Sequence, residues 1–165
     1  METYDAIKKR VSVRKYSDRN VSKEDLERIV EAGARAATAN NVQPVSFIVV
    51  TDEATRKELA SIAPKNGPYM AESPAVIAVI SEPVKYYLED GSAATENILV
   101  MARDLGLGTV WVAGDRKPYC ADILQALGAP ADHKLVSLVC VGYPKDGFTE
   151  TPKKALKEVL HWEKY

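Results

Sequence analysis

The sequence predicts an α+β domain in which helices cover a central sheet. Three observations indicate this fold class: short apolar runs of strand length, amphipathic runs of helix length between and after them, and a globular composition with 46% hydrophobic and 27% charged residues. With 165 residues the chain has the size of one domain, and we expect residues 1–165 to share one fold.

Four apolar runs rich in β-branched residues predict the strands of the sheet. Three of them are continuous enough to be buried on both faces, as expected of strands that are covered by helices on each side. These three runs are residues 47–50, 75–80 and 135–141, and the fourth strand is expected over 109–112.

Helices are predicted between and after these runs. Ser22, with Asp25 three residues later, is typical of a helix N-terminus, and an apolar stripe follows over residues 26–37. The other predicted helices are 90–105 and 122–127, and residues 63–73, which contain two prolines and a glycine, are expected to form a loop. Small residues at 91–94 let another backbone approach closely, so we expect this part of the long helix to contact a second subunit.

The charge balance excludes a generally basic or acidic surface. With 22 basic and 23 acidic residues the net charge is −1, so we expect neither a nucleic-acid partner nor a membrane partner. The longest nearly apolar run, Pro74–Ile80, is far shorter than the roughly 20 residues that span a bilayer. The opening ten residues lack the apolar core of a secretory signal, and Cys120 and Cys140 lack the spacing of a zinc site. These features predict a cytoplasmic protein without a bound metal.

A basic cluster near the N-terminus is the first candidate site. Residues 8–19 contain six basic side chains and one acidic one. Within them Arg10, Ser12 and Arg14 alternate with two valines, so an extended segment directs two guanidinium groups and a hydroxyl to one side, where they suit a phosphate. The alternative is a solvated helix end, because cations are favoured at a helix C-terminus.

A cluster of amides after the first long helix is the second candidate. Asn40, Asn41 and Gln43 can each donate and accept hydrogen bonds, as reading the edge of a planar heterocycle or a polyol chain requires. The alternative is a turn, since Asn tolerates left-handed conformations and Pro44 favours an extended entry into the next strand.

Together these segments resemble the nitroreductase family of flavoproteins. Residues 10–14 are similar to the family's Arg-x-Ser-x-Arg opening, and residues 39–44 to its Ala-Gly-Asn-x-Gln-Pro turn. The remaining similar segments follow in the family's order and extend the resemblance over essentially the whole chain: residues 90–97, Gly106-Leu-Gly108, Trp111, Gly142-Tyr-Pro144 and residues 152–165.

The resemblance implies a nitroreductase-like central mixed sheet covered by helices, in a homodimer that binds FMN at each of two interface sites. By position, Arg10, Ser12 and Lys154, or Lys153 in its place, hold the phosphate and ribityl end. Arg14 and Asn41 lie toward the pyrimidine edge of the ring, and Gln43 lies near that edge or the ribityl. From the partner subunit, residues 37–39 face the flavin and Gly114 offers its N–H near N5. The expected cofactor-binding residues are Arg10, Val11, Ser12, Arg14, Ala37, Thr38, Ala39, Asn41, Gln43, Ala113, Gly114, Lys153 and Lys154.

The function implied by this resemblance is that of an NAD(P)H-dependent flavin oxidoreductase. It reduces a nitroaromatic, a quinone or a similar acceptor by a ping-pong mechanism; FMN carries the chemistry, and Arg14 and Gly114 tune it. The family often has an aromatic residue where Val45 stands and an acidic residue near Ala113. An alternative is therefore a flavin-binding carrier or sensor with little turnover. A nucleic-acid contact at the basic cluster is disfavoured by the balanced net charge.

Overall fold

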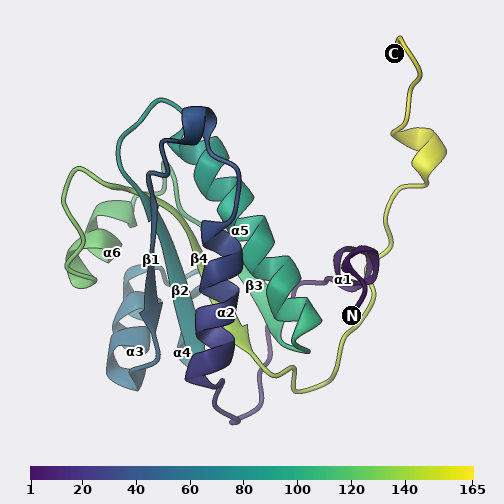
Figure 1. The fold of residues 1–165 in the computed structure, drawn as a ribbon. Helices are drawn as coiled ribbons and strands as arrows, with labels where there is room; N and C mark the ends of the chain where they lie inside the picture. The colour runs from purple at the N-terminus through teal and green to yellow at the C-terminus, as the bar shows by residue number, and fades with distance from the viewer.

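The computed structural model describes residues 1–165 and contains one four-stranded sheet with helices on both faces (Figure 1). The strand order is β1-β2-β4-β3, and every neighbouring pair is antiparallel. The expected mixed sheet is thus antiparallel in its four strands, and a parallel pairing occurs only at the isolated bridge between Ser12 and Thr109. The strands are β1 (Val45–Val50), β2 (Ala75–Ser81), β3 (Gly108–Ala113) and β4 (Lys134–Gly142).

Six α-helices surround the sheet. Helices α2 and α5 cover one face, and α3, α4 and α6 cover the other, while α1 packs beside α5 (Figure 1). Two short 3₁₀ turns, η1 (Ala39–Asn41) and η2 (Leu156–Glu158), lie in the connections. The helices are α1 (Thr3–Lys9), α2 (Lys23–Ala34), α3 (Glu53–Ile62), α4 (Gly67–Glu72), α5 (Tyr87–Asp104) and α6 (Cys120–Ala126).

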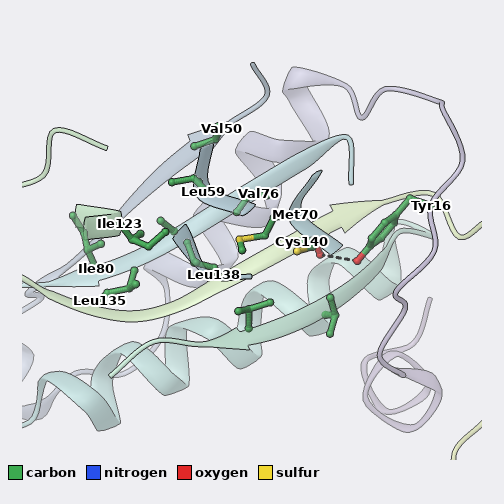
Figure 2. Close-up of a cluster of buried hydrophobic side chains, with 14 of the residues drawn as sticks. Tyr16, Val50, Leu59, Met70, Val76, Ile80, Ile123, Leu135, Leu138 and Cys140 are labelled. Carbon is green, nitrogen blue, oxygen red and sulfur yellow. Dashed lines mark hydrogen bonds between the residues drawn. The ribbon is translucent and has the colours of Figure 1, made fainter. Parts of the chain in front are cut away.

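Strand alternation divides the core into two layers. On β2, Val76 and Ala78 face the layer under α3, α4 and α6, whereas Ile77 and Val79 face the layer under α2 and α5. Figure 2 shows the first layer, in which side chains from the helices pack against β2 and β4. All residues of β2 are buried, as the sequence predicted for a strand covered on both faces.

The predicted loop over 63–73 is wrong, because α4 forms within it. Pro68 lies in the first turn of α4, where its missing N–H leaves no hydrogen bond unmade. Met70 is fully buried, and this burial stabilises a helix that the local composition does not favour. Two further boundaries differ: α2 ends at Ala34, three residues before the predicted end, and α5 begins at Tyr87, three residues before the predicted start.

Two of the four small residues at 91–94, Gly91 and Ala94, are buried against the chain's own sheet and are therefore not available to a second subunit as expected. A Cβ atom on Gly91 would lie 2.5 Å from a methyl group of Val136. Ala94 is 1% exposed, and the Thr95 hydroxyl lies 2.9 Å from that of Ser137 in β4. These residues therefore let α5 approach β4 closely within one chain.

Candidate functional site

The Arg10–Arg14 segment lies along the open edge of β3. Val13 donates its N–H to the Thr109 carbonyl at 2.8 Å, which fixes this segment at the start of the edge strand. The two valines between the polar residues are buried, whereas Ser12 and Arg14 are exposed. The predicted alternation is confirmed for Ser12 and Arg14, which leave a hydroxyl and a guanidinium on the solvent side of β3, but Arg10 is half-buried and does not share that side.

The two arginines of this segment are held by different partners. Arg10 Nε lies 3.4 Å from Glu96 Oε1 on α5, and its side chain is 19% exposed. The Arg14 guanidinium lies over the ring of Tyr69, 5.9 Å from its centre. Tyr69 belongs to α4, the helix that the sequence did not predict, so its contribution to this site was missed.

The other end of the β3 edge presents the N–H of Ala113. Gly114 donates its N–H to the Val136 carbonyl at 3.0 Å, whereas the Thr109 and Ala113 carbonyls accept hydrogen bonds from the opposite side of β3, from Val13 and Tyr119. Because the backbone groups of an antiparallel ladder alternate between its two sides, the Ala113 N–H also points away from β4. Ala113 is exposed and Gly114 is buried. The Gly114 N–H is thus occupied by the sheet, and Ala113 carries the outward donor of this pair.

Gly114 has a structural reason to be glycine. A Cβ atom there would lie 2.7 Å from the Val136 carbonyl oxygen, which is too close for any other residue without movement of the backbone. One chain also presents both Ser12 and Ala113 on one strand edge. The approach of Gly114 to the flavin from the partner subunit stays a prediction.

The amide-rich turn has an unusual backbone conformation. Asn40, Asn41 and Gln43 all have left-handed backbones, with φ between 53° and 56°. The turn is closed by the Gln43 N–H, which donates to Thr38 Oγ1 at 3.1 Å. Asn41 and Gln43 are exposed, so their amides are directed to solvent rather than into the chain's own core.

Asp90 anchors this turn, and the sequence analysis missed it. Its carboxylate is buried, at 5% exposure, and its Oδ1 accepts the Ala39 N–H at 2.9 Å, while Oδ2 has no partner within the chain. The sequence signal that could have identified Asp90 is a carboxylate within a helical run of small residues, because such a run packs closely against a sheet.

A second contact ties the start of α5 to the loop after β3. The Tyr87 hydroxyl donates to Asp115 Oδ1 at 2.5 Å, and this hydrogen bond raises the pKa of Tyr87 above its ordinary value. The first turn of α5 therefore holds both the turn that follows Thr38 and the loop that follows Ala113.

Lys153 and Lys154 lie in a C-terminal tail that leaves the body of the molecule (Figure 1). Every residue from 149 to 165 is exposed. The tail carries large apolar side chains without a covering surface, among them Leu156 at 69% and Trp162 at 76% exposure. Neither lysine forms an ion pair within the chain, and the ion-pair partner of Arg10 is Glu96.

The predicted residues do not form one enclosed pocket within a single chain. Ser12 and Arg14 line a cavity of about 180 Å³ together with Asp146 and Thr149. That volume is below the roughly 300–1,000 Å³ typical of cofactor pockets, and no residue of the turn at 37–43 lines it. Arg10 contacts Glu96 and Ala39 contacts Asp90, at separate places along α5.

Comparison with known proteins assigns the family. The model of the nitroreductase family matches residues 7–87 and 61–143, which together span most of the chain. The chain belongs to the nitroreductase family. A relative from Archaeoglobus fulgidus, provisionally named an NADH dehydrogenase/NAD(P)H nitroreductase, is 39% identical over 165 residues and covers 94% of each chain. An NADPH-flavin oxidoreductase of Vibrio harveyi is 27% identical, over 99% of this chain and 74% of its own.

Solved structures agree with this nitroreductase assignment. A crystal structure from Parabacteroides distasonis, also provisionally named an NADH dehydrogenase/NAD(P)H nitroreductase, superposes with a TM-score of 0.93 at 30% identity, covering 100% of this chain and 99% of its own. An FMN-dependent nitroreductase from Clostridium difficile gives 0.86 at 25% identity, covering 98% and 99%. The predicted family and α+β fold class are confirmed. No helix of this nitroreductase combines the length and the apolar character that crossing a bilayer requires.

Proposed function

We propose that this nitroreductase is an FMN-dependent oxidoreductase that takes reducing equivalents from NAD(P)H and passes them to a nitroaromatic, a quinone or a similar acceptor. Membership of the family and relatives named NAD(P)H nitroreductase and NADPH-flavin oxidoreductase support this proposal. The observation that carries it is the edge of β3, which presents the Ser12 hydroxyl and the Arg14 guanidinium at one end, with Arg10 beside them in contact with α5, and an outward backbone donor at the other end.

The donor set on this edge fits FMN. FMN, when bound, supplies the chemistry by accepting a hydride from the nucleotide and giving electrons to the acceptor. Arg10 and Ser12 bind the phosphate and ribityl end, because Arg is a fixed fork of donors suited to phosphate. Arg14 holds a positive charge toward the pyrimidine edge, where ring reduction places negative charge. The outward Ala113 N–H takes the role of N5 donor that was expected of Gly114.

We further propose that the site is completed by a second copy of the chain. The turn that contains Thr38 and Ala39 has exposed amides at Asn41 and Gln43, and none of its residues lines the cavity beside Ser12. The exposed apolar tail also lacks a surface to cover it, and exposed apolar patches of this kind mark protein contacts. In a homodimer the turn of one chain faces the β3 edge of the other, and Lys153 or Lys154 is available to the phosphate.

The test is an anaerobic measurement of the two half-reactions. The purified protein is loaded with FMN, reduced with NADPH or NADH, and then mixed with a quinone or a nitroaromatic while flavin absorbance is followed. The proposal expects bleaching by the nucleotide, recovery by the acceptor, and parallel lines in double-reciprocal plots. Bound flavin that is not bleached by either NADPH or NADH would instead support the alternative function of a flavin-binding carrier or sensor.

A further inference from the structure

A second cavity lies at the loop that follows β3, and its charged lining is mostly basic. It has a volume of about 450 Å³ and lies between the start of α5, the loop after β3, α6 and the start of β4. Its polar lining consists of Tyr87, Asp115, Arg116, Lys117, His133 and Lys134.

The cations of this cavity outnumber its acidic side chains. Its lining contains three permanent cations and one carboxylate, whereas the whole chain has a net charge of −1. That carboxylate, Asp115, accepts a hydrogen bond from Tyr87 through Oδ1 and lies 3.5 Å from Arg116 Nε through Oδ2. Lys117 and Lys134 form no ion pair within the chain, so their charge is available to a ligand.

The backbone of the loop adds donors to this positive charge. Asp115 and Arg116 are consecutive left-handed residues, with φ of 26° and 55°. The N–H groups of Arg116 and Lys117 donate to no backbone carbonyl, although the neighbouring Asp115 N–H donates to the Leu135 carbonyl at 2.7 Å. Successive free N–H groups in such a turn form a concavity that binds anions.

The position of the cavity relates it to the proposed flavin. Arg116 follows Ala113 by three residues, which an extended chain spans in at most about 10 Å. A nicotinamide ring stacked on a flavin beside Ala113 would therefore have its ribose and phosphates within reach of Arg116 and Lys117. No other described cavity has three cations in its lining.

We propose that this cavity is the phosphate subsite for the pyridine nucleotide. The inference rests on the proposed function, because it takes NAD(P)H as the electron donor. Two phosphate sources have the same chemistry: the diphosphate that NADH and NADPH share, and the 2′-phosphate that NADPH alone carries. Arg116, Lys117 and Lys134 bind one of these groups and orient the nicotinamide toward the flavin.

The experiment compares three reductants in the FMN-loaded protein: NADPH, NADH and the phosphate-free N-benzyl-dihydronicotinamide. The variants are the double substitution Arg116→Ala/Lys117→Ala and the single substitution Lys134→Gln. Lys23→Gln is the matched control, since Lys23 is an exposed cation on α2 that lies outside this cavity. Flavin content is measured for each protein, and NADP⁺ binding is measured by calorimetry as a readout independent of turnover.

The double variant is expected to lose roughly tenfold or more in kcat/KM with a phosphate-bearing reductant, and NADP⁺ affinity falls by a similar factor. Its flavin content and its reduction by N-benzyl-dihydronicotinamide stay unchanged. A loss of kcat/KM with NADPH alone indicates that the subsite binds the 2′-phosphate. A loss of kcat/KM with both nucleotides indicates that it binds the diphosphate. Equal effects on all three reductants, or no effect on NADP⁺ binding, would overturn the subsite. A wild-type protein that none of the three reduces would instead overturn the proposed function.

Discussion

Arg10 and Arg14, at the β3 edge, are expected to affect different properties of the bound FMN: its affinity and its reduction potential. Arg10 is assigned to the phosphate, whose charge does not change when the ring is reduced. Arg10→Ala should therefore weaken FMN binding by about 1.5–3 kcal/mol and leave the reduction potential nearly unchanged. Arg14→Ala should lower the potential more than the affinity, because its charge favours the reduced ring. FMN titration and potentiometry measure the two effects, and equal changes in both variants would refute the separate roles.

Asp90 should control the shape of the turn after Thr38. Asp90→Ala leaves the Ala39 N–H without its acceptor, which costs roughly 1–3 kcal/mol and releases three left-handed residues from their anchor. We expect lower stability to urea and weaker FMN binding. Asp90→Asn keeps an acceptor oxygen and serves as the conservative control. If Asp90→Ala bound FMN as tightly as wild type, the turn would not need this anchor.

Cys140 makes stability sensitive to alkaline pH. Burial raises the pKa of its thiol from about 9 to about 12. Above pH 9 the unfolded chain therefore loses this proton while the folded chain keeps it, so the free energy of unfolding falls as pH rises toward 12. The slope approaches about 1.4 kcal/mol per pH unit from this group alone. Urea unfolding across this range should show a shallower slope for Cys140→Ala, and an identical slope would contradict the assignment.

At the scale of elements, the strands and the long helices could be predicted from the sequence because their signals are local. Continuous β-branched runs identified β2 and β4, and Ser22 caps α2 by accepting the Asp25 N–H at 3.1 Å. Helix α4 could not be predicted, because its stability depends on the burial of Met70 against distant residues. The antiparallel pairing of all four strands is likewise a property of chain topology, which apolar runs do not encode.

Because α5 contacts β4 closely, we expect a glycine-to-alanine substitution in α5 to destabilise the protein, which is the opposite of its usual effect in a helix. Replacing a helical glycine by alanine normally stabilises a helix by about 1 kcal/mol. In Gly91→Ala the new Cβ would lie 2.5 Å from Val136, so we expect destabilisation of about 1–3 kcal/mol instead. Ser92→Ala, at the next and less buried position, is the control. Urea unfolding measures both, and a stabilised Gly91→Ala protein would show that the contact relaxes freely.

At the scale of the whole molecule, the sequence predicted two site segments: the alternation of Arg10, Ser12 and Arg14, and the amide-rich turn. It did not predict how these two segments lie relative to each other. Local patterns place each segment on an edge or a turn. Arg10 and Ala39 contact α5 at two separate positions, and these positions depend on how the segments pack in three dimensions. The choice of Ala113 over Gly114 as the outward donor depends on the ladder register between β3 and β4. The role of Asp90 could not be predicted, because the sequence does not show that its carboxylate is buried.

The tail should couple dimerisation to flavin binding. Leu156→Ser/Trp162→Ser removes two of its exposed apolar side chains, so we expect a weaker dimer and lower flavin content. Because FMN is expected to bind the dimer, excess FMN should partly restore the dimer of this variant. Lys164→Ser, another exposed tail position, is the control. Size-exclusion chromatography over a range of concentrations measures the association, and an unchanged dimer would exclude the tail as its contact.

The central claim is that FMN is held at a site built from two chains. Sedimentation velocity of the purified, FMN-saturated protein, followed in both the protein band and the visible flavin band, tests it most directly. We predict one boundary at the mass of a dimer, carrying one FMN per chain in both signals. A monomer that retains tightly bound FMN, or a protein that sediments without any flavin after FMN is added, would contradict it.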